Sequence, residues 1–335
     1  MVKSSYNRLH SFRYLRLALL SCCLQLPLVA TVDAAEPQAS PASTLELKQA
    51  ADYSKDGADT CLRCHDEDSA FPVLSIFKTK HGSRTDPHSP LAQYQCESCH
   101  GPVGEHGKKR LRKGETREAM ITFTRGNEIS VAEKNAICTS CHEQLDKRHW
   151  AGSSHQTGEV ACSDCHKIHV KEDPIRLKQL QVQVCGSCHQ AEKLASKRFS
   201  THPLEYGQMG CTDCHSPHGS NADKLLVADT INDTCFGCHA EKRGPFAWEH
   251  EPASENCALC HNPHGSNQPA MLTQKVPFLC QNCHSSAGHP SLAQDSSRLS
   301  TPYASSSALL LGRSCTNCHS SIHGSNHPSG SRFQR

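Results

Sequence analysis

Large apolar and aromatic side chains are scarce in this sequence. Aromatic residues make up 5% of the 335 residues, and the hydrophobic fraction of 36% already includes 22 cysteines. Ordinary globular domains contain about 45–50% apolar residues. A chain of this length with so few apolar side chains cannot fill a conventional core, which excludes an ordinary α/β enzyme. We therefore expect a non-protein group to fill the interior.

Charge of one sign and long apolar runs are lacking as well. The 35 basic and 33 acidic residues leave a formal net charge of +2, which excludes a strongly basic nucleic-acid-binding protein. After residue 34 no apolar run is long enough for a transmembrane helix. The sequence also contains no phosphate-binding loop, no nucleotide-binding fingerprint and no Ser/His/Asp arrangement.

Residues 1–34 are predicted to be a secretory signal peptide. Basic residues precede a short apolar stretch, and Val32-Asp33-Ala34 supplies a small-residue cleavage site. No adjacent arginine pair occurs, which favours the general secretory route over the twin-arginine route. Lipoprotein processing at Cys22 is an alternative, although apolar sequence continues past that cysteine.

One short motif, Cys-x-x-Cys-His, recurs ten times and contains every cysteine outside the predicted signal peptide. Its cysteine pairs are Cys61 and Cys64, Cys96 and Cys99, Cys138 and Cys141, Cys162 and Cys165, Cys185 and Cys188, Cys211 and Cys214, Cys235 and Cys238, Cys257 and Cys260, Cys280 and Cys283, and Cys315 and Cys318. The remaining two, Cys22 and Cys23, lie in the predicted signal peptide. The mature chain thus has no spare thiol for a disulfide bond or a catalytic nucleophile.

The histidine that follows every cysteine pair decides between the chemistries open to this motif. Zinc sites and a disulfide framework also use paired cysteines, but neither explains the histidine. Ten chance occurrences have a probability on the order of 10⁻¹² at this histidine frequency, and the motif is that of covalent c-type haem attachment. Two cysteines one helical turn apart form thioethers, and the adjacent histidine ligates the iron. The predicted proximal ligands are His65, His100, His142, His166, His189, His215, His239, His261, His284 and His319.

Thirteen further histidines follow the predicted signal peptide, and ten of them are arranged in order. Five motifs, which we call flanked, have one histidine upstream and one downstream, whereas the five bare motifs that alternate with them have neither. The predicted distal ligands are His81 and His106, His155 and His169, His202 and His218, His250 and His264, and His289 and His323. His88, His149 and His327 are left over, and Met120, Met209 and Met271 are interpreted as packing residues rather than ligands. These counts predict ten haems, each with two histidine ligands.

The position of each downstream histidine limits which haem it can ligate. A histidine three residues after the proximal one, such as His169 after His166, starts on the same side of the porphyrin. It cannot easily reach the opposite face of the same iron, so we expect it to ligate a neighbouring haem. With one haem for about every thirty residues, the haems form the core, and the predicted fold is short α-helices and coil with almost no β-sheet.

The motifs resemble those of the periplasmic decahaem c-type cytochromes of the MtrA/DmsE/PioA family. The resemblance extends from about Gly57 to the C-terminus and includes Cys211-Thr-Asp-Cys-His-Ser-Pro-His-Gly-Ser220. It implies an elongated haem wire built of two pentahaem halves, here residues 60–199 and 200–335, after an N-terminal segment, residues 35–59. It also implies a periplasmic protein associated with the outer membrane and held in a β-barrel partner. The Cys315 haem would face an extracellular multihaem cytochrome or terminal reductase, and the Cys61 haem a periplasmic or inner-membrane cytochrome donor.

Two classes of function were compared. Catalysis at haem iron needs an open coordination position, whereas all ten motifs end in histidine and ten distal histidines are available. This favours an electron conduit over a multihaem reductase of the nitrite or hydroxylamine type, and the chain is predicted not to be an enzyme. Haem storage fits poorly because thioether-linked haem cannot be released. A freely diffusing periplasmic electron shuttle is the alternative to a wire held in a barrel.

Overall fold

The computed structural model describes residues 53–69, 72–108, 110–126, 129–142, 149–285 and 315–332. They all belong to one compact unit, Thr44–Arg335. The predicted signal peptide and the predicted ligand His289 lie outside the described residues.

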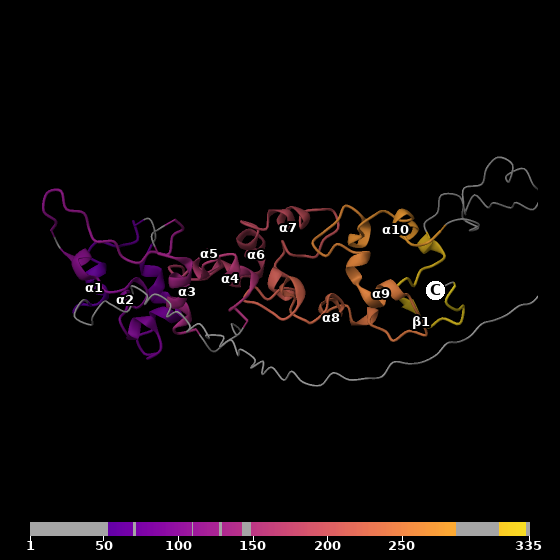
Figure 1. Ribbon diagram of the computed structural model, residues 1–335, viewed down its shortest axis with the longest axis horizontal. Coiled ribbons are helices and arrows are strands. Elements are labelled where there is room, and N and C mark those ends of the chain that lie inside the picture. The colour runs from indigo at the N-terminus through magenta and orange to yellow at the C-terminus, as the bar shows by residue number, and fades with distance from the viewer. Residues whose placement is uncertain are drawn as a thin grey trace, which may run out of the picture. The chain divides into compact units, whose positions relative to one another are not determined.

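Short helices joined by loops make up nearly all of the described chain (Figure 1). The α-helices are α1 (Ala58–Cys61), α2 (Glu97–His100), α3 (Val131–Thr139), α4 (Ser154–Thr157), α5 (Cys162–Cys165), α6 (Lys178–Cys185), α7 (Gln190–Ala195), α8 (Ile231–Phe236), α9 (Glu251–Glu255) and α10 (Phe278–Gln281). The 3₁₀ helices are η3 (Leu74–Lys78), η4 (Lys80–Gly82), η5 (Pro90–Ala92), η6 (Gly104–Gly107), η7 (Pro174–Arg176), η8 (Cys211–Asp213), η9 (Asp223–Leu225), η10 (Ala240–Lys242), η11 (Cys257–Leu259), η12 (Pro269–Met271) and η13 (Cys315–Asn317).

Side-chain caps, rather than a long apolar face, begin several of these helices. Ser130 and Glu133 form a reciprocal capping box at the start of α3, which at nine residues is the longest described α-helix. The Thr230 hydroxyl accepts the Asp233 N–H at 3.0 Å and so caps α8. Each cap satisfies a backbone N–H that has no partner in the first turn. The helices are too short to be stable alone, so other contacts must hold them.

The described sheet consists of two strands of two residues each. Strand β1 (Trp248–Glu249) pairs antiparallel with β2 (Gly324–Ser325), with Trp248 opposite Ser325. The Trp248 indole N–H also donates to the His327 carbonyl at 3.1 Å. This pairing ties the C-terminal segment to a loop almost eighty residues earlier. The predicted fold class, short helices and coil with almost no sheet, is confirmed.

The polypeptide does not build an apolar core of its own in the described region. Its buried apolar residues are few and mostly small, and no large side chain is fully buried there. They are Ala58, Leu91, Val103, Ala161, Ile175, Val182 and Ala195. Buried polar residues, among them Asn135, Gln181 and Asn232, outnumber them. The space that a core would fill is instead a cavity, described below.

Hydrogen bonds cross the predicted boundary between residues 60–199 and 200–335. Lys178 of α6 donates to the Asp213 carboxylate at 2.9 Å, and Gln181 bonds to Thr212. The division into two pentahaem halves stays a prediction. None of the helices in the described ranges has the length and apolar character that a membrane span requires.

Candidate haem sites

Every motif forms one helical turn of the same geometry. In all ten, the histidine N–H donates to the carbonyl of the first cysteine, at 2.9–3.1 Å. This bond places the two thiols and the imidazole on one side of the turn, where a single ligand can meet all three. All twenty motif cysteines carry free thiols in the described chain, so each is available for a thioether bond.

Bare and flanked motifs differ in where they lie on their helices. The five bare motifs begin at or near the C-terminal ends of α1, α3, α6, α8 and α10. The five flanked motifs instead begin the short turns α2, α5, η8, η11 and η13. The alternation seen in the sequence is therefore a structural repeat of two motifs.

Nine of the ten proximal imidazoles face one predicted distal imidazole each. Their ring centroids are 5.9–6.4 Å apart. The pairs are His65 with His106, His100 with His169, His142 with His81, His166 with His218, His189 with His155, His215 with His264, His239 with His202, His261 with His323, and His284 with His250. An imidazole nitrogen bonds a first-row metal at about 2.0–2.1 Å, so two imidazoles on one ion have centroids about 6.3 Å apart. The observed spacing fits an iron between the rings.

The pairing follows two rules that the sequence did not reveal. A histidine upstream of a flanked motif faces the bare motif that follows, as His155 faces His189. A histidine downstream of a flanked motif faces the motif two positions earlier, as His264 faces His215. The downstream histidines thus meet a different proximal ligand from that of their own motif, as their spacing predicts. His106 is an exception to the second rule. Its own motif is the second in the chain, so it faces the first motif, one position earlier rather than two.

Hydrogen bonds at Nδ1 turn the other nitrogen of many of these rings toward the space between them. The proximal His100, His215 and His261 contact the carbonyls of Ile121, Lys224 and Ala270 at 2.7–2.9 Å. The distal His106, His155 and His202 contact carbonyls at 2.7–3.0 Å. A carbonyl can only accept, so Nδ1 carries the proton and Nε2 is left to bind iron.

Two distal histidines make the same kind of hydrogen bond, to the residue that precedes another distal histidine. His155 bonds to the carbonyl of Pro217, the residue before the distal His218. His202 bonds in the same way to Pro263, the residue before His264. A glycine follows His264, and a Cβ on that Gly265, where φ is +124°, would overlap the carbonyl of Ala195. Close backbone approach therefore requires glycine after this distal ligand.

Burial favours the neutral form of several distal imidazoles. It lowers the pKa of His81, His169, His250, His264 and His323 below the ordinary histidine value. Iron binds the neutral ring, so fewer protons have to be displaced when the ligand bonds form.

One continuous cavity of about 5040 Å³ connects the motifs. All ten proximal histidines, all nine described distal histidines and at least one cysteine of every motif line it. Small-molecule pockets measure about 300–1,000 Å³, so this cavity has room for on the order of ten such groups. The residues present fit covalently attached haem in donor type, spacing and volume.

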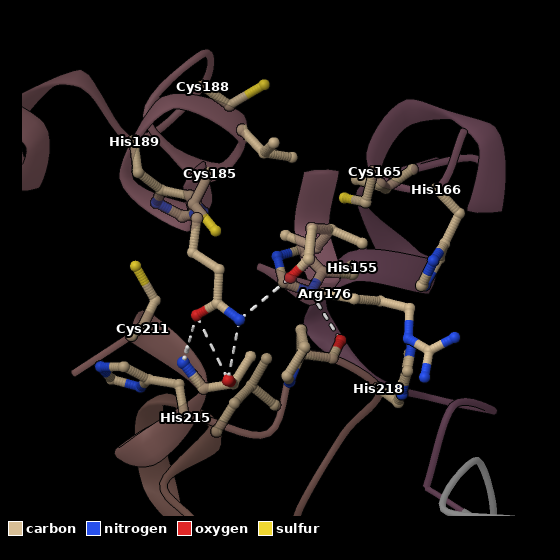
Figure 2. Close-up of a pocket in the computed structure, with 18 of the residues that line it drawn as sticks. His155, Cys165, His166, Arg176, Cys185, Cys188, His189, Cys211, His215 and His218 are labelled. Atoms are coloured by element: carbon tan, nitrogen blue, oxygen red, sulfur yellow. Dashed lines mark hydrogen bonds between the residues drawn. The ribbon is translucent and has the colours of Figure 1, made fainter. Parts of the chain in front are cut away.

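Consecutive motifs meet through their cysteines. The first cysteine of the following motif, together with burial, raises the pKa of Cys61, Cys185, Cys235 and Cys280, and these neighbours are Cys96, Cys211, Cys257 and Cys315, respectively. Burial raises the pKa of Cys99, Cys165, Cys214 and Cys260, and a second cysteine of the next motif adds to each rise. Figure 2 shows one such junction, with Cys185 and Cys211 between His189 and His215. These interactions place cysteines of successive motifs close together in the described chain.

Buried amide side chains hold neighbouring motifs together, and sequence reasoning missed them. Asn135 of α3 accepts the N–H of Cys162, and Asn232 of α8 accepts that of Cys257, both at 2.8 Å. Gln181 of α6 accepts the Thr212 N–H at 3.1 Å. A polar residue three or four positions before the first cysteine of three bare motifs was the available signal.

The three histidines predicted not to be ligands lie apart from this pairing. No ring contact in the described chain joins His88, His149 or His327 to a proximal imidazole. His88 does line the cavity, and the His149 carbonyl lies against Gly219. Of the predicted distal ligands, only His289 lies outside the described residues, so the partner that the pairing leaves for His319 is not seen. The predicted ligand roles themselves stay predictions.

Comparisons with known proteins place the chain among multihaem cytochromes. It is 46% identical over 294 residues to the multiheme cytochrome MtrA of Shewanella baltica, which covers 88% of this chain and 86% of that protein. It is 28% identical over 178 residues to the cytochrome c-type protein NrfB of Haemophilus influenzae, covering 49% of this chain and 76% of that protein. The doubled CXXCH motif family matches residues 202–244 and 250–289, and the NrfB-like cytochrome c family matches residues 96–181.

Proposed function

Since this chain belongs to the MtrA family of multihaem c-type cytochromes, we propose that it conducts electrons from periplasmic donors toward or across the outer membrane. The acceptor at the far end is an extracellular cytochrome or a terminal reductase. The observation that carries this function is the continuous cavity in which proximal and distal imidazoles face each other motif after motif.

Ten haems are attached, one to each motif, and each has two histidine ligands. The nine imidazole pairs described above supply the ligands of nine haems. His289 is the remaining predicted distal ligand and is assigned to His319 by elimination. His88, His149 and His327 take no part in ligation.

The bound group supplies one electron-accepting and electron-donating iron per site. The chain's residues do the rest. The two facing imidazoles at each site would both hold the iron and would leave no position on it for a substrate. Cysteine contacts between successive motifs set neighbouring sites close together, so that one electron can pass from site to site. No bond is made or broken and no proton is required, which is why no catalytic residue is assigned.

The path follows the order of the sequence, from the Cys61 motif toward the Cys315 motif. The contacts between cysteines of consecutive motifs support this order. By the family resemblance, the Cys61 end faces the periplasmic or inner-membrane cytochrome donor, and the Cys315 end faces the extracellular partner.

A partner must shield this chain where it crosses the outer membrane. The bilayer with its headgroups is about 40–45 Å thick, and buried charge is expensive in lipid. Charged residues make up 20% of the chain, and the haem propionates would add further negative charge. Large outer-membrane barrels have lumens wide enough to hold folded protein. The chain therefore sits in the periplasm, associated with a separately encoded β-barrel.

Liposomes that contain a reductant test this function. The cytochrome together with the barrel should let an external oxidant drain the internal reductant, whereas either component alone should not. Equal flux from the cytochrome without the barrel would refute the shielded conduit. A cytochrome that never associates with membranes but exchanges electrons rapidly in solution would support the freely diffusing shuttle.

A multihaem reductase makes a different spectroscopic prediction. A substrate-binding iron has an open position and gives a five-coordinate, high-spin signal in the resting protein. The proposed conduit gives only six-coordinate, low-spin signals. Electron paramagnetic resonance of the protein as purified distinguishes the two.

A further inference from the structure

One proximal histidine has a different hydrogen-bond acceptor from its counterparts. The Nδ1 of His166, in the Cys162 motif, lies 2.6 Å from the carboxylate Oδ2 of Asp173. The other carboxylate oxygen of Asp173 accepts the backbone N–H of Lys167 at 3.1 Å. The bond to His166 is partly buried, and the Asp173 side chain is 14% exposed. Figure 2 shows His166 beside Cys165, with its partner ligand His218 nearby.

Three proximal histidines of other flanked motifs have an uncharged hydrogen-bond acceptor at Nδ1. His100, His215 and His261 contact backbone carbonyls at 2.7–2.9 Å. All three belong to flanked motifs, as His166 does. The Cys162 motif is therefore the one among these four in which a negative charge, rather than a dipole, holds the ligand.

The sequence around His166 explains the exchange of acceptor. In the Cys211 and Cys257 motifs the acceptor carbonyl comes from Lys224 and Ala270, which have left-handed backbone with φ of 56° and 53°. The Cys162 motif is followed instead by a shorter loop that ends at Asp173, before Pro174 starts η7. The Asp173 side chain does not cap η7, which leaves the carboxylate to bind His166.

The charge of Asp173 is not neutralised by a cation in the described chain, since no lysine or arginine forms an ion pair with it there. Asp164, a second carboxylate in the same motif, differs in this respect. It pairs with Arg125 at 2.8 Å and accepts the Ala161 N–H at 2.9 Å, and it makes no bond to His166. The two carboxylates thus provide a matched comparison beside one haem site.

We propose that Asp173 is a positioning residue that makes His166 an unusually strong electron donor to iron and thereby lowers the reduction potential of the Cys162 haem. A carboxylate that accepts a hydrogen bond from Nδ1–H increases the basicity of the imidazole, and a basic ligand stabilises ferric over ferrous iron. This inference rests on the proposed function. A lower reduction potential would make electron transfer to the Cys162 site less favourable and transfer from it to the Cys185 site more favourable.

The test is a redox titration of the full ten-haem protein, followed by absorbance and by low-spin electron paramagnetic resonance signals. Asp173→Asn keeps the shape and an acceptor oxygen but removes the charge. Changes to outer-shell partners typically cost 10–100-fold in metal affinity or activity, and we take the lower end for the redox equilibrium. We expect about a tenfold rise in the ferrous-to-ferric ratio of one haem at fixed potential, equal to about 59 mV for one electron. About one tenth of the haem absorbance should shift, together with the g-values of one low-spin signal.

Two further variants separate this role from general effects. Asp173→Glu keeps the charge and should restore the wild-type titration at least in part. Asp164→Asn removes a paired charge from the same motif and should leave the g-values of every signal unchanged. Mass spectrometry of each variant confirms that ten haems remain attached.

The outcomes are distinct. Asp173→Asn with ten low-spin haems and an unchanged titration would refute the role of Asp173 and leave the proposed function intact. An equal shift in Asp164→Asn and Asp173→Asn would also refute it, because charge alone would then explain both. High-spin haem in the resting wild-type protein would instead overturn the proposed function.

Discussion

The pairing of His264 with His215 gives the most specific prediction about this protein. His264 lies three residues after His261, yet its ring centroid is 6.0 Å from that of His215, two motifs earlier. Substitution of His264 by alanine should therefore open one axial position at the Cys211 haem and leave the Cys257 haem intact. All ten haems should stay attached, because no cysteine is changed.

The size of the effect follows from the count of sites. One iron in ten should become five-coordinate, so the high-spin signal should integrate to about one tenth of the total haem. Cyanide should bind in a ratio of one per protein. Electron paramagnetic resonance and cyanide titration measure these two quantities. His88→Ala is the control, since His88 lines the same cavity without facing a proximal ring.

The identity of the affected haem can be tested in two nine-haem backgrounds. With Cys211→Ala and Cys214→Ala, the haem predicted to lose its ligand is absent, so His264→Ala should add no high-spin signal. With Cys257→Ala and Cys260→Ala, the same change should add the full signal. The reverse pattern would show that His264 ligates the haem of its own motif, and the pairing rule drawn from the structure would be wrong.

Three further predictions concern attachment, packing and pH. The mass of the processed protein should exceed that of its polypeptide by ten haems, and a mass with nine or fewer would contradict the count. Asn232→Ala leaves the buried Cys257 N–H without its 2.8 Å acceptor and should cost about 1–3 kcal/mol of unfolding free energy in guanidinium titrations, whereas the exposed Gln190→Ala should cost almost none. The hydrogen bond from Lys178 is the main cause that lowers the pKa of Asp213. Their pairing therefore stabilises the fold above the pKa of an unfolded aspartate, and this stabilisation is lost as pH falls through the lowered pKa of Asp213. Lys178→Met should raise the midpoint of acid unfolding slightly, because a surface pair contributes at most about 1 kcal/mol; an unchanged midpoint would mean the pair adds no stability.

Haem attachment was readable from the sequence because its chemistry is local. Cys-x-x-Cys-His fixes two thiols and a ligand within five residues, and one helical turn suffices to place them. The fold class followed from the same motifs, since a chain with few large apolar side chains needs another group in its interior. The expectation that a histidine such as His169 faces the proximal ligand of another motif also came from spacing alone.

The partner of each distal histidine was not readable, because it depends on contacts between distant segments. His323 faces His261 only because β2 pairs with β1 and brings the C-terminal segment back along the chain. Two-residue strands leave no hydrophobic pattern that a sequence could reveal. Counting histidines showed that there were enough ligands but left every assignment of ligand to haem open.

Asp173 was also missed, although a signal was present. The Cys211 and Cys257 motifs share the residues Pro-His-Gly-Ser around their downstream histidine, whereas the Cys162 motif has Ile168-His169-Val170. A loop of different sequence has to provide a different acceptor for the proximal imidazole. An aspartate seven residues after His166, immediately before a proline, was the candidate.

The two-motif pairing rule also bears on how such a chain can change in length and how it matures. A downstream histidine faces a site two motifs earlier, so under the proposed ligand assignment a site near the N-terminus gains its second ligand only after later motifs have been synthesised. Folding of those sites must then wait for distant sequence, while haem attachment need not. Deleting one motif would leave the first downstream histidine beyond the deletion two positions from a motif of the other class, whereas deleting a neighbouring bare and flanked motif together would preserve the register.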